Sequence, residues 1–450
     1  MANQFLNAQE YANVMLLLLK NQLVFGRLVD GEFKNEVTDE NGLTINVKRP
    51  PRFLDKKDGT ANLAAQDVLT GSAPVSVSQY SKVHISIGDI EYVTSYNALM
   101  QNQTMKSAAQ RLAQSVDSYI GGLTLRFHSW VAGGDTSDAD IAMNSTDPTQ
   151  YVRGPMQAMA AHTRLMSQGV PNESLSGIVT FKDGQYIRGS LLSDFTPDIN
   201  VSMLQRTKIP IISEVDWYAS QNLPTLVLGT RTQGDGSSAG AQINQANQNV
   251  NYRGAVAGAA GSPTYMQQTL SIKGLTAGQT VALGEVFTIQ NVFAWDWRNQ
   301  VALDYLQQFT VLAPATADGS GDIAALSISP AIIVPGTSDG VSTDGNSAFG
   351  TVDSIPAANA YIQFAGAASA KVIVKPTFHK RAISLVSARL QMPFTGVASY
   401  AVDPDTGIAV RYWRGSDIVT GQHIHRWDMM YGGAVLDPFL GTRLSGQAEG

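Results

Sequence analysis

Two short patterns bring potential metal ligands close together. His423 and His425 lie two residues apart, and Asp403 and Asp405 are followed by Gly407. A strand would place both imidazoles on one face, but no third ligand or carboxylate pattern completes a zinc site. The aspartates resemble the start of a calcium loop, yet the glycine comes early and no glutamate closes the loop. We therefore expect no metal, and we interpret the aspartate segment as a tight turn that feeds a hairpin.

The chain also lacks the patterns of common catalytic and phosphate-binding sites. The segments 234–236 and 319–321 are Gly-x-Gly, without the strand-to-helix context and the lysine that a phosphate-binding loop needs. No Gly-x-Ser-x-Gly segment is present to hold a serine nucleophile. The absence of cysteine excludes a disulfide scaffold, a thiolate metal site and a cysteine nucleophile. The sequence therefore predicts a protein that is not an enzyme and that uses no cofactor.

Charged side chains suggest contact sites instead. A basic cluster comprises Lys48, Arg49, Arg52, Lys56 and Lys57. Two aspartates lie in the same stretch and no aromatic ladder accompanies it, so we favour contact with an acidic segment of another subunit. A nucleic-acid patch is the alternative. Arg253 is the single charged residue between Ser237 and Ile272 and is a further candidate for contact between subunits.

The segment Trp295-Asp296-Trp297-Arg298 is the most aromatic short stretch that we considered for binding. Its two indoles could stack on a sugar or a base. They could equally seal a small β-barrel or anchor an interface, and we favour that interpretation.

Composition points to a protein that meets other subunits. The 450 residues include 31 basic and 37 acidic side chains, which gives a net charge of −6. Charged residues make up 15% of the chain, below the roughly 25% of ordinary soluble domains. The length suggests two to three domains, and the mildly acidic balance argues against coating nucleic acid. Because interface cores are depleted in charge, much of the uncharged polar surface is expected to be buried against other copies.

Elements in the first half of the chain follow hydrophobic periodicity. We expect a helix from Ala8 to about Leu23, whose apolar run is far too short to span a membrane. Period-two alternation predicts an extended two-stranded loop over about 43–90. A long helix is expected from Thr104 to about Val131, and another from Pro155 to Gln168. Asp183 is expected to cap a helix over 185–195.

The second half is rich in short strands. Strands are expected at 268–272, 280–283, 286–289, 308–311 and 323–329, which is the pattern of a small sheet or barrel. Strands return at 371–374, 409–413 and 423–431, with a helical or irregular piece around 382–385. A β-rich block thus interrupts an α+β frame.

Three stretches in this order resemble a known family. They are Val83–Tyr92 with Ser107–Ala113, then Gly274–Gln279 with Gly284–Ile289 and Leu306–Val311, and finally Met429–Gly433. Together with the order of elements they resemble the major coat protein of short-tailed bacteriophages, similar to the Salmonella phage coat-protein family with an inserted β-barrel domain. That family has the Hong Kong 97-type capsid fold, so the resemblance implies an α+β fold.

The resemblance also implies a domain plan. Residues 1–42 would form an N-terminal arm and 43–92 the E-loop. Residues 93–228 would hold the spine helix of the peripheral domain and the first part of the axial domain. Residues 229–366 would be the inserted domain, and 367–450 the remainder of the axial and peripheral domains. In the family a loop of the inserted domain makes charged contacts between capsomers, whereas here Gln242–Ala257 holds only Arg253 among amides, so amide hydrogen bonds are the expected substitute.

By this resemblance the chain is expected to build the icosahedral shell of a double-stranded DNA phage. Its expected partners are copies of itself in pentamers and hexamers, a scaffolding protein, a portal protein and DNA bound without sequence specificity, with no membrane. It would be assembled in the reducing cytoplasm of a bacterial host and would reside in the virion. The alternatives are a carbohydrate-binding or adhesin-type β protein, and a cellular nanocompartment shell of the same fold.

Overall fold

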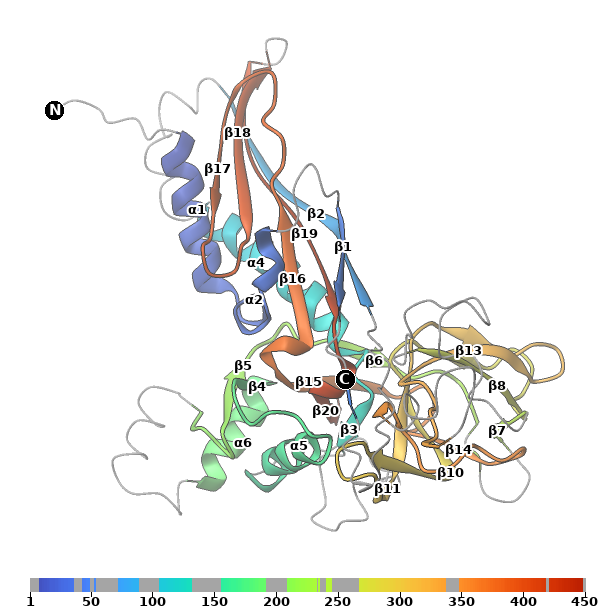
Figure 1. Ribbon diagram of the computed structural model, residues 1–450. Helices are drawn as coiled ribbons and strands as arrows, with labels where there is room; N and C mark the ends of the chain where they lie inside the picture. Colours follow the sequence, from blue (N-terminus) through green and yellow to red (C-terminus); the bar gives the residue numbers. More distant parts are fainter. Residues whose placement is uncertain are drawn as a thin grey trace, which may run out of the picture. The chain divides into compact units, whose positions relative to one another are not determined.

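The computed structural model describes residues 8–35, 43–48, 52–53, 72–88, 105–131, 155–191, 209–232, 234, 240–244, 267–336, 348–417 and 421–447. The chain forms two compact units, each assembled from segments far apart in sequence (Figure 1). Unit 1 comprises residues 1–47, 73–123 and 383–436, and unit 2 comprises residues 48–72, 124–382 and 437–450. Both contain helices and sheets, which confirms the predicted α+β class.

Unit 1 is built on one long antiparallel sheet. Its strands are β1 (Thr44–Lys48), β2 (Ser72–Gly88), β16 (Ile383–Ala388), β17 (Val397–Val402), β18 (Ala409–Asp417) and β19 (Gln422–Val435). The order is β1-β2-β19-β18-β17, with β16 also paired to β19. The pairing of β1 with β2 confirms the expected two-stranded segment. The helical or irregular piece expected around 382–385 is wrong beyond Ala382, because every residue of β16 is buried and pairs with β19.

Helices cover one face of this sheet. They are α1 (Ala8–Gln22), the short α2 (Phe25–Leu28), the 3-10 turn η1 (Glu32–Asn35) and α4 (Met105–Thr124). The ring of Tyr11 in α1 stacks on Tyr412 of β18 with a centroid distance of 5.2 Å. Ser115 of α4 lies 2.9 Å from the hydroxyl of Tyr431 in β19. Asn7 directly precedes the expected helix and is a residue type that commonly caps a helix N-terminus, but it lies outside the described residues.

The long helix is shorter than its sequence suggested. It ends at Thr124 instead of Val131, since the N–H of Phe127 returns to the carbonyl of Thr124 and the next residues form a strand. That strand, β3 (Ser129–Val131), pairs in parallel with β20 (Gly441–Gln447). The apolar pattern in the sequence continues past Thr124 because residues 129–131 of the following strand are all buried as well. This continuation made the helix look longer than it is.

Unit 2 contains a mixed sheet with two helices. The sheet has the order β3-β20-β15-β4-β5, with β6 also on β15. Its other strands are β15 (Lys371–His379), β4 (Leu175–Val179), β5 (Val215–Ala219) and β6 (Thr225–Val227), and η4 (Lys380–Ala382) and η5 (Pro438–Leu440) are short 3-10 turns. Helix α5 (Pro155–Ser167) ends before Gly169, as predicted, and Gly169 has a φ of +78°. Buried side chains of α5, β4 and β5 share one hydrophobic core.

Helix α6 (Phe181–Leu191) begins earlier than the sequence suggested. Thr180 is its first capping residue: the Thr180 hydroxyl accepts from the Asp183 N–H, and the Asp183 carboxylate accepts from the Thr180 N–H. The same carboxylate holds the buried ammonium group of Lys375 at 2.9 Å. Asp183 therefore closes a reciprocal cap one turn into the helix and also neutralises a buried cation, instead of starting a helix at 185.

The rest of unit 2 is a small closed β-barrel. Its strands are β7 (Gln242–Ile243), β8 (Gln268–Lys273), β10 (Val286–Asp296), β11 (Val301–Val311), β13 (Ile323–Ser329) and β14 (Ile362–Phe364), with the pair β9 (Thr280–Val281) and β12 (Ala315–Thr316) beside them. The sheet order is β14-β10-β11-β13-β8-β7. It closes because Ile243 donates to the carbonyl of Ala360, and Ile362 donates to that of Ala241, both at 2.9 Å. The barrel expected from the short strands is therefore present.

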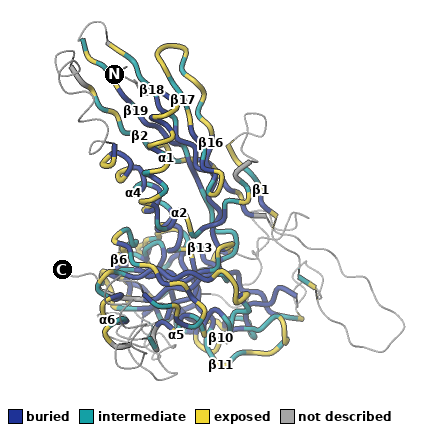
Figure 2. Tube along the Cα trace, turned by 90° about the vertical axis from the view of Figure 1, so that its left-hand side faces the viewer, coloured by how far each residue is buried: buried dark blue, intermediate teal, exposed yellow. Residues whose placement is uncertain are grey.

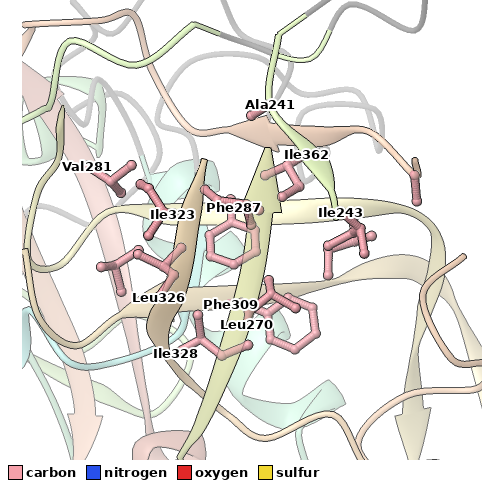
Figure 3. Close-up of a cluster of buried hydrophobic side chains, with 14 of the residues drawn as sticks. Ala241, Ile243, Leu270, Val281, Phe287, Phe309, Ile323, Leu326, Ile328 and Ile362 are labelled. Atoms are coloured by element: carbon pink, nitrogen blue, oxygen red, sulfur yellow. The ribbon is translucent and has the colours of Figure 1, made fainter. Parts of the chain in front are cut away.

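A cluster of buried apolar side chains lies inside the barrel (Figure 3). The ring of Phe287 lies 5.7 Å from Phe309 and 5.5 Å from Phe364, and aliphatic side chains from β8, β13 and β7 fill the remaining space. Aromatic side chains of this kind carry a large share of the buried area of a small core. Among the described residues, no helix is long and apolar enough to cross a membrane.

Candidate assembly surface

Of the predicted basic cluster, the structure describes Lys48 and Arg52. Lys48 ends β1 and is exposed. The guanidinium of Arg52 lies 4.6 Å from the ring centroid of Trp297, and Phe349 and Phe439 are within 5.8 Å of it. Arg49, Lys56, Lys57 and Arg253 lie outside the described residues. Arg52 is thus engaged by aromatic rings of its own unit.

The aromatic segment of residues 295–298 is part of the barrel. Trp295 pairs with Ala302 across the β10–β11 hairpin, and Trp297 follows in the turn. Arg52 and Arg298 both place guanidinium groups over the Trp297 ring, at 4.6 and 5.4 Å from its centroid. The ring therefore holds cations of the same chain, which favours the structural interpretation over a sugar platform.

The two histidines of β19 have ordinary hydrogen-bond partners. Nδ1 of His425 lies 2.7 Å from the hydroxyl of Tyr412, and Nδ1 of His423 lies 2.8 Å from that of Ser416. Burial lowers the pKa of His425 to about 4, so its imidazole is neutral at neutral pH. In the described part of the chain, no group of three or more His, Asp or Glu side chains is placed to hold a metal ion.

Residues 403–407 form the turn between β17 and β18, as predicted. The Asp403 carboxylate accepts hydrogen bonds from the backbone N–H and the hydroxyl of Thr406, at 3.2 and 2.7 Å. It also lies 3.0 Å from the ammonium group of Lys20 in α1. The aspartate pattern thus closes a turn and fastens a helix to it.

One face of the unit 1 sheet points away from α1 and α4. We call it the open face. It carries the even-numbered residues of β19 that precede the β-bulge at Tyr431 and Gly432, together with their neighbours on the adjoining strands. Its described side chains include Tyr80, Lys82 and His84 of β2, Ile424, Arg426 and Asp428 of β19, Arg411 and Trp413 of β18, and Tyr400 of β17. Figure 2 shows exposed and intermediate residues along the ends of these strands.

Asp428 organises the centre of the open face. Its side chain is fully buried, and its two oxygens lie 2.5 Å from Nη2 of Arg411 and 2.5 Å from Nε of Arg426. The Arg426 guanidinium also donates to the hydroxyl of Tyr80. Both guanidinium groups lie within 6 Å of the Trp413 ring, at 5.9 and 5.6 Å from its centroid. A single carboxylate holds two arginines, so this rigid aromatic surface keeps a positive charge.

Sequence reasoning missed this network. Arg411 and Trp413, like Arg426 and Asp428, stand two residues apart in alternating strands, which places each pair on one face. That alternation was a usable signal for a polar face. The register that brings Arg411 opposite Asp428 depends on a long-range pairing that no local pattern fixes.

A second polar network joins the barrel to the mixed sheet within unit 2. The Gln308 amide of β11 accepts from the Trp130 N–H at 2.8 Å and donates to the Trp130 carbonyl at 3.0 Å. The fully buried guanidinium of Arg443 in β20 donates to the carbonyl of Gly284 at 2.8 Å and to the hydroxyl of Thr310. Burial lowers the pKa of Arg443 to about 9, so it stays charged at neutral pH. Buried donors on β20 and β11 therefore bind acceptors across the junction, which fixes the barrel to the sheet.

Comparison with known families decides what the chain is. Residues 227–446, which include the barrel strands and the long C-terminal strands, match the family described as P22 coat protein, gene protein 5. The chain is a major capsid protein of a tailed bacteriophage. This match confirms the resemblance to phage coat proteins seen in the sequence. It also means that copies of the capsid protein associate with one another.

Solved capsid structures resemble the capsid protein at low sequence identity. The capsid of Ralstonia phage GP4 is 8% identical with a TM-score of 0.44, covering 100% of this chain and 94% of that one. A structure from Mycobacterium phage Che8 is 13% identical with a TM-score of 0.43, covering 94% and 91%. The CUS-3 coat protein I-domain is 22% identical with a TM-score of 0.20, covering 28% of this chain and 92% of that one. No protein with a curated description matches the capsid protein.

Proposed function

We propose that the chain assembles into the icosahedral shell of a double-stranded DNA phage, as pentamers and hexamers, without enzymatic activity. The observation that carries this proposal is the coat-protein match over residues 227–446. Its support is physical as well. The chain has 15% charged residues, and a closed lattice can gain its stability from many modest interfaces between identical copies.

The domain plan from the sequence is part of this proposal. Residues 1–42 would act as the N-terminal arm, with α1 as its helix, and 43–92 as the E-loop, with β1 and β2 at its base. Residues 93–228 would contribute α4 as the spine helix, together with the first part of the axial domain. The closed barrel supports an inserted domain at 229–366, and 367–450 would complete the axial and peripheral domains.

The proposed partners follow from the resemblance to phage coat proteins. They are a scaffolding protein during assembly, a portal protein, and DNA that is contained without sequence-specific contacts. A net charge of −6 favours containment over binding, because a DNA-coating surface needs many cations to neutralise phosphates. Assembly in the bacterial cytoplasm agrees with the absence of cysteine. Arg49, Arg52, Lys48, Lys56, Lys57 and Arg253 stay proposed contacts between subunits.

Co-expression with the scaffolding protein from the same genome tests the proposal. Negative-stain electron microscopy and sedimentation should show closed shells of uniform diameter that contain this chain as the main component. A soluble, monomeric product under conditions in which the scaffolding protein is folded and present would contradict it. Glycan binding that is lost in Trp295→Ala would instead favour the carbohydrate-binding alternative.

A further inference from the structure

An exposed phenylalanine on unit 1 is held in a fixed place by its neighbours. Residues 389–396, which we call the strap, connect β16 to β17. Phe394 in the strap is fully exposed, with 106% relative accessibility, and Met392 and Val397 are 43% and 49% exposed. Single exposed apolar residues are normal on protein surfaces. Three large ones within six residues form a patch that the unit itself leaves uncovered.

The strap is fastened on both sides of Phe394. The guanidinium of Arg411 donates to the carbonyl of Gln391, and the indole N–H of Trp413 donates to that of Thr395 at 3.0 Å. Gly396 then turns the chain with a φ of +86°, and a Cβ there would lie 2.5 Å from the carbonyl oxygen of Arg414. The patch therefore keeps its shape before it meets a partner, which lowers the entropy lost on binding.

The strap and the open face share side chains. Arg411 and Trp413, which fasten the strap, also belong to the network around Asp428. Arg389, the first residue of the strap, lies 5.7 Å from the ring centroid of Tyr400. The apolar patch is thus continuous with a positively charged aromatic surface that includes Lys82, Arg411 and Arg426.

The charge of this surface indicates its occupant. The chain as a whole carries a net charge of −6, so the surface outside the open face carries a larger net negative charge. A second copy of the same chain therefore offers acidic surface that complements the open face, and copies of a capsid protein must associate. Phenylalanine, tyrosine and arginine are all enriched at the cores of protein interfaces, and tyrosine and arginine are enriched among the residues that dominate binding energy.

We propose that Phe394 and the strap are an anchor that docks on a second copy of this chain, with the cations of the open face binding acidic side chains of that copy. The inference rests on the proposed assembly into a shell. It adds to that function a specific surface, its occupant and the residues that hold it in shape.

The absence of cysteine allows a clean test in the full-length protein. In F394C the introduced thiol is the only one, and it can carry an environment-sensitive fluorophore such as acrylodan. The matched control is F181C, since Phe181 begins α6 in unit 2 and is 58% exposed. When shells form, we expect the dye at position 394 to lose its contact with water and its emission to shift to the blue. The shift at position 181 should be smaller or absent.

Three outcomes would overturn the inference. Shells that form while the dye at position 394 stays solvated would exclude the anchor and leave the proposed function intact. A blue shift caused by the scaffolding protein alone, before shells form, would identify that protein as the occupant. An equal shift at both positions would show that burial is not specific to the strap. Complete failure of the unlabelled wild-type chain to form shells would instead contradict the proposed function.

A second variant measures the strength of the contact. F394S should raise the protein concentration needed for assembly at least about tenfold, because burial of one phenylalanine accounts for that much in an association constant. F181S is the matched control and should change it less than threefold. Thermal unfolding of unassembled F394S should equal that of the wild type, since Phe394 is fully exposed in the monomer. An unchanged threshold in F394S would contradict the proposal.

Discussion

The ammonium group of Lys20 lies 3.0 Å from a carboxylate oxygen of Asp403, although the two residues are 383 positions apart in the sequence. Lys20 also pairs with Asp405. These carboxylates raise the pKa of Lys20, first through the hydrogen bond to Asp405 and then through that to Asp403. The last turn of α1 is thereby fastened to the turn between β17 and β18, with the cation at the helix C-terminus, where the helix dipole favours it.

Removing this cation should loosen the N-terminal helix. In Lys20→Met the carboxylate of Asp403 keeps its bonds to Thr406, so the turn is expected to persist while α1 loses its attachment. Amide hydrogen exchange should become faster in residues 8–22 and stay unchanged in β18. High salt should reduce the difference between variant and wild type, because the pair is partly exposed. Equal exchange in both proteins at low salt would show that apolar packing alone holds the helix.

Gln308 is predicted to carry much of the junction between the barrel and the mixed sheet. Gln308→Met keeps a similar volume but leaves both backbone groups of Trp130 without their partners. Each unsatisfied buried group costs about 1–3 kcal/mol, so with two such groups unit 2 should lose about 2–6 kcal/mol of unfolding free energy. Urea unfolding followed by tryptophan fluorescence measures this loss. Gln290→Met, at an exposed position of β10, is the control and should change stability by less than about 0.5 kcal/mol.

Acid should destabilise unit 2 through His128. Burial, helped by the charge of Arg164, lowers the pKa of this histidine to about 3. Between that value and the unfolded pKa of about 6.5, the unfolded chain binds a proton that the folded chain does not. Stability from this group is therefore present above about pH 6.5 and falls as the pH drops, by up to about 1.4 kcal/mol per pH unit.

A histidine variant isolates that contribution. His128→Gln can still donate to the carbonyl of Pro438, which lies 3.2 Å from Nδ1, but it does not titrate. Its unfolding free energy should fall less steeply than that of the wild type between pH 6.5 and 4. Gln290→Met, which removes no titratable group, should follow the wild type. Parallel pH profiles for the wild type and His128→Gln would contradict the assignment.

Two glycines should respond in opposite directions to alanine. Gly122 lies in α4 with nothing within 4 Å of an added Cβ, so Gly122→Ala should stabilise unit 1 by about 0.5–1 kcal/mol. Gly396 has a positive φ and backbone oxygen close by, so Gly396→Ala should distort the strap and impair assembly. Unfolding curves and shell yield measure the two effects. A normal shell yield in Gly396→Ala would show that the geometry of the strap does not matter.

Local sequence patterns predicted which helices and strands exist better than they predicted the residues at which these elements begin and end. Alternation over residues 75–87 located β2, and the short strands after residue 267 located the barrel, because strand and helix periodicities are written in consecutive residues. The end of α4 at Thr124 was missed because a buried strand follows it and extends the apolar signal. The strand at Ile383–Ala388 was missed because its pairing partner in β19 lies about fifty residues further along the chain.

The candidate surface was harder to predict than the fold. The basic cluster was visible as a run of charges, yet Arg52 is held by aromatic rings, Trp297 among them, that only the tertiary structure brings to it. The Arg411, Arg426 and Asp428 network needs the register between β18 and β19. The exposure of Phe394 also depends on contacts from residues of β18. Contacts of this kind follow from long-range pairing, which single-sequence periodicity does not encode.

In the proposed assembly, identical copies of this chain close into an icosahedral shell. Cryo-electron microscopy of particles assembled from the full-length chain with its scaffolding protein tests it most directly. We predict an icosahedral reconstruction in which pentamers and hexamers of this chain account for the continuous shell density, with the strap of each subunit against a neighbouring copy. Particles without icosahedral order, or a shell built from another protein to which this chain binds only at isolated positions, would contradict this assembly.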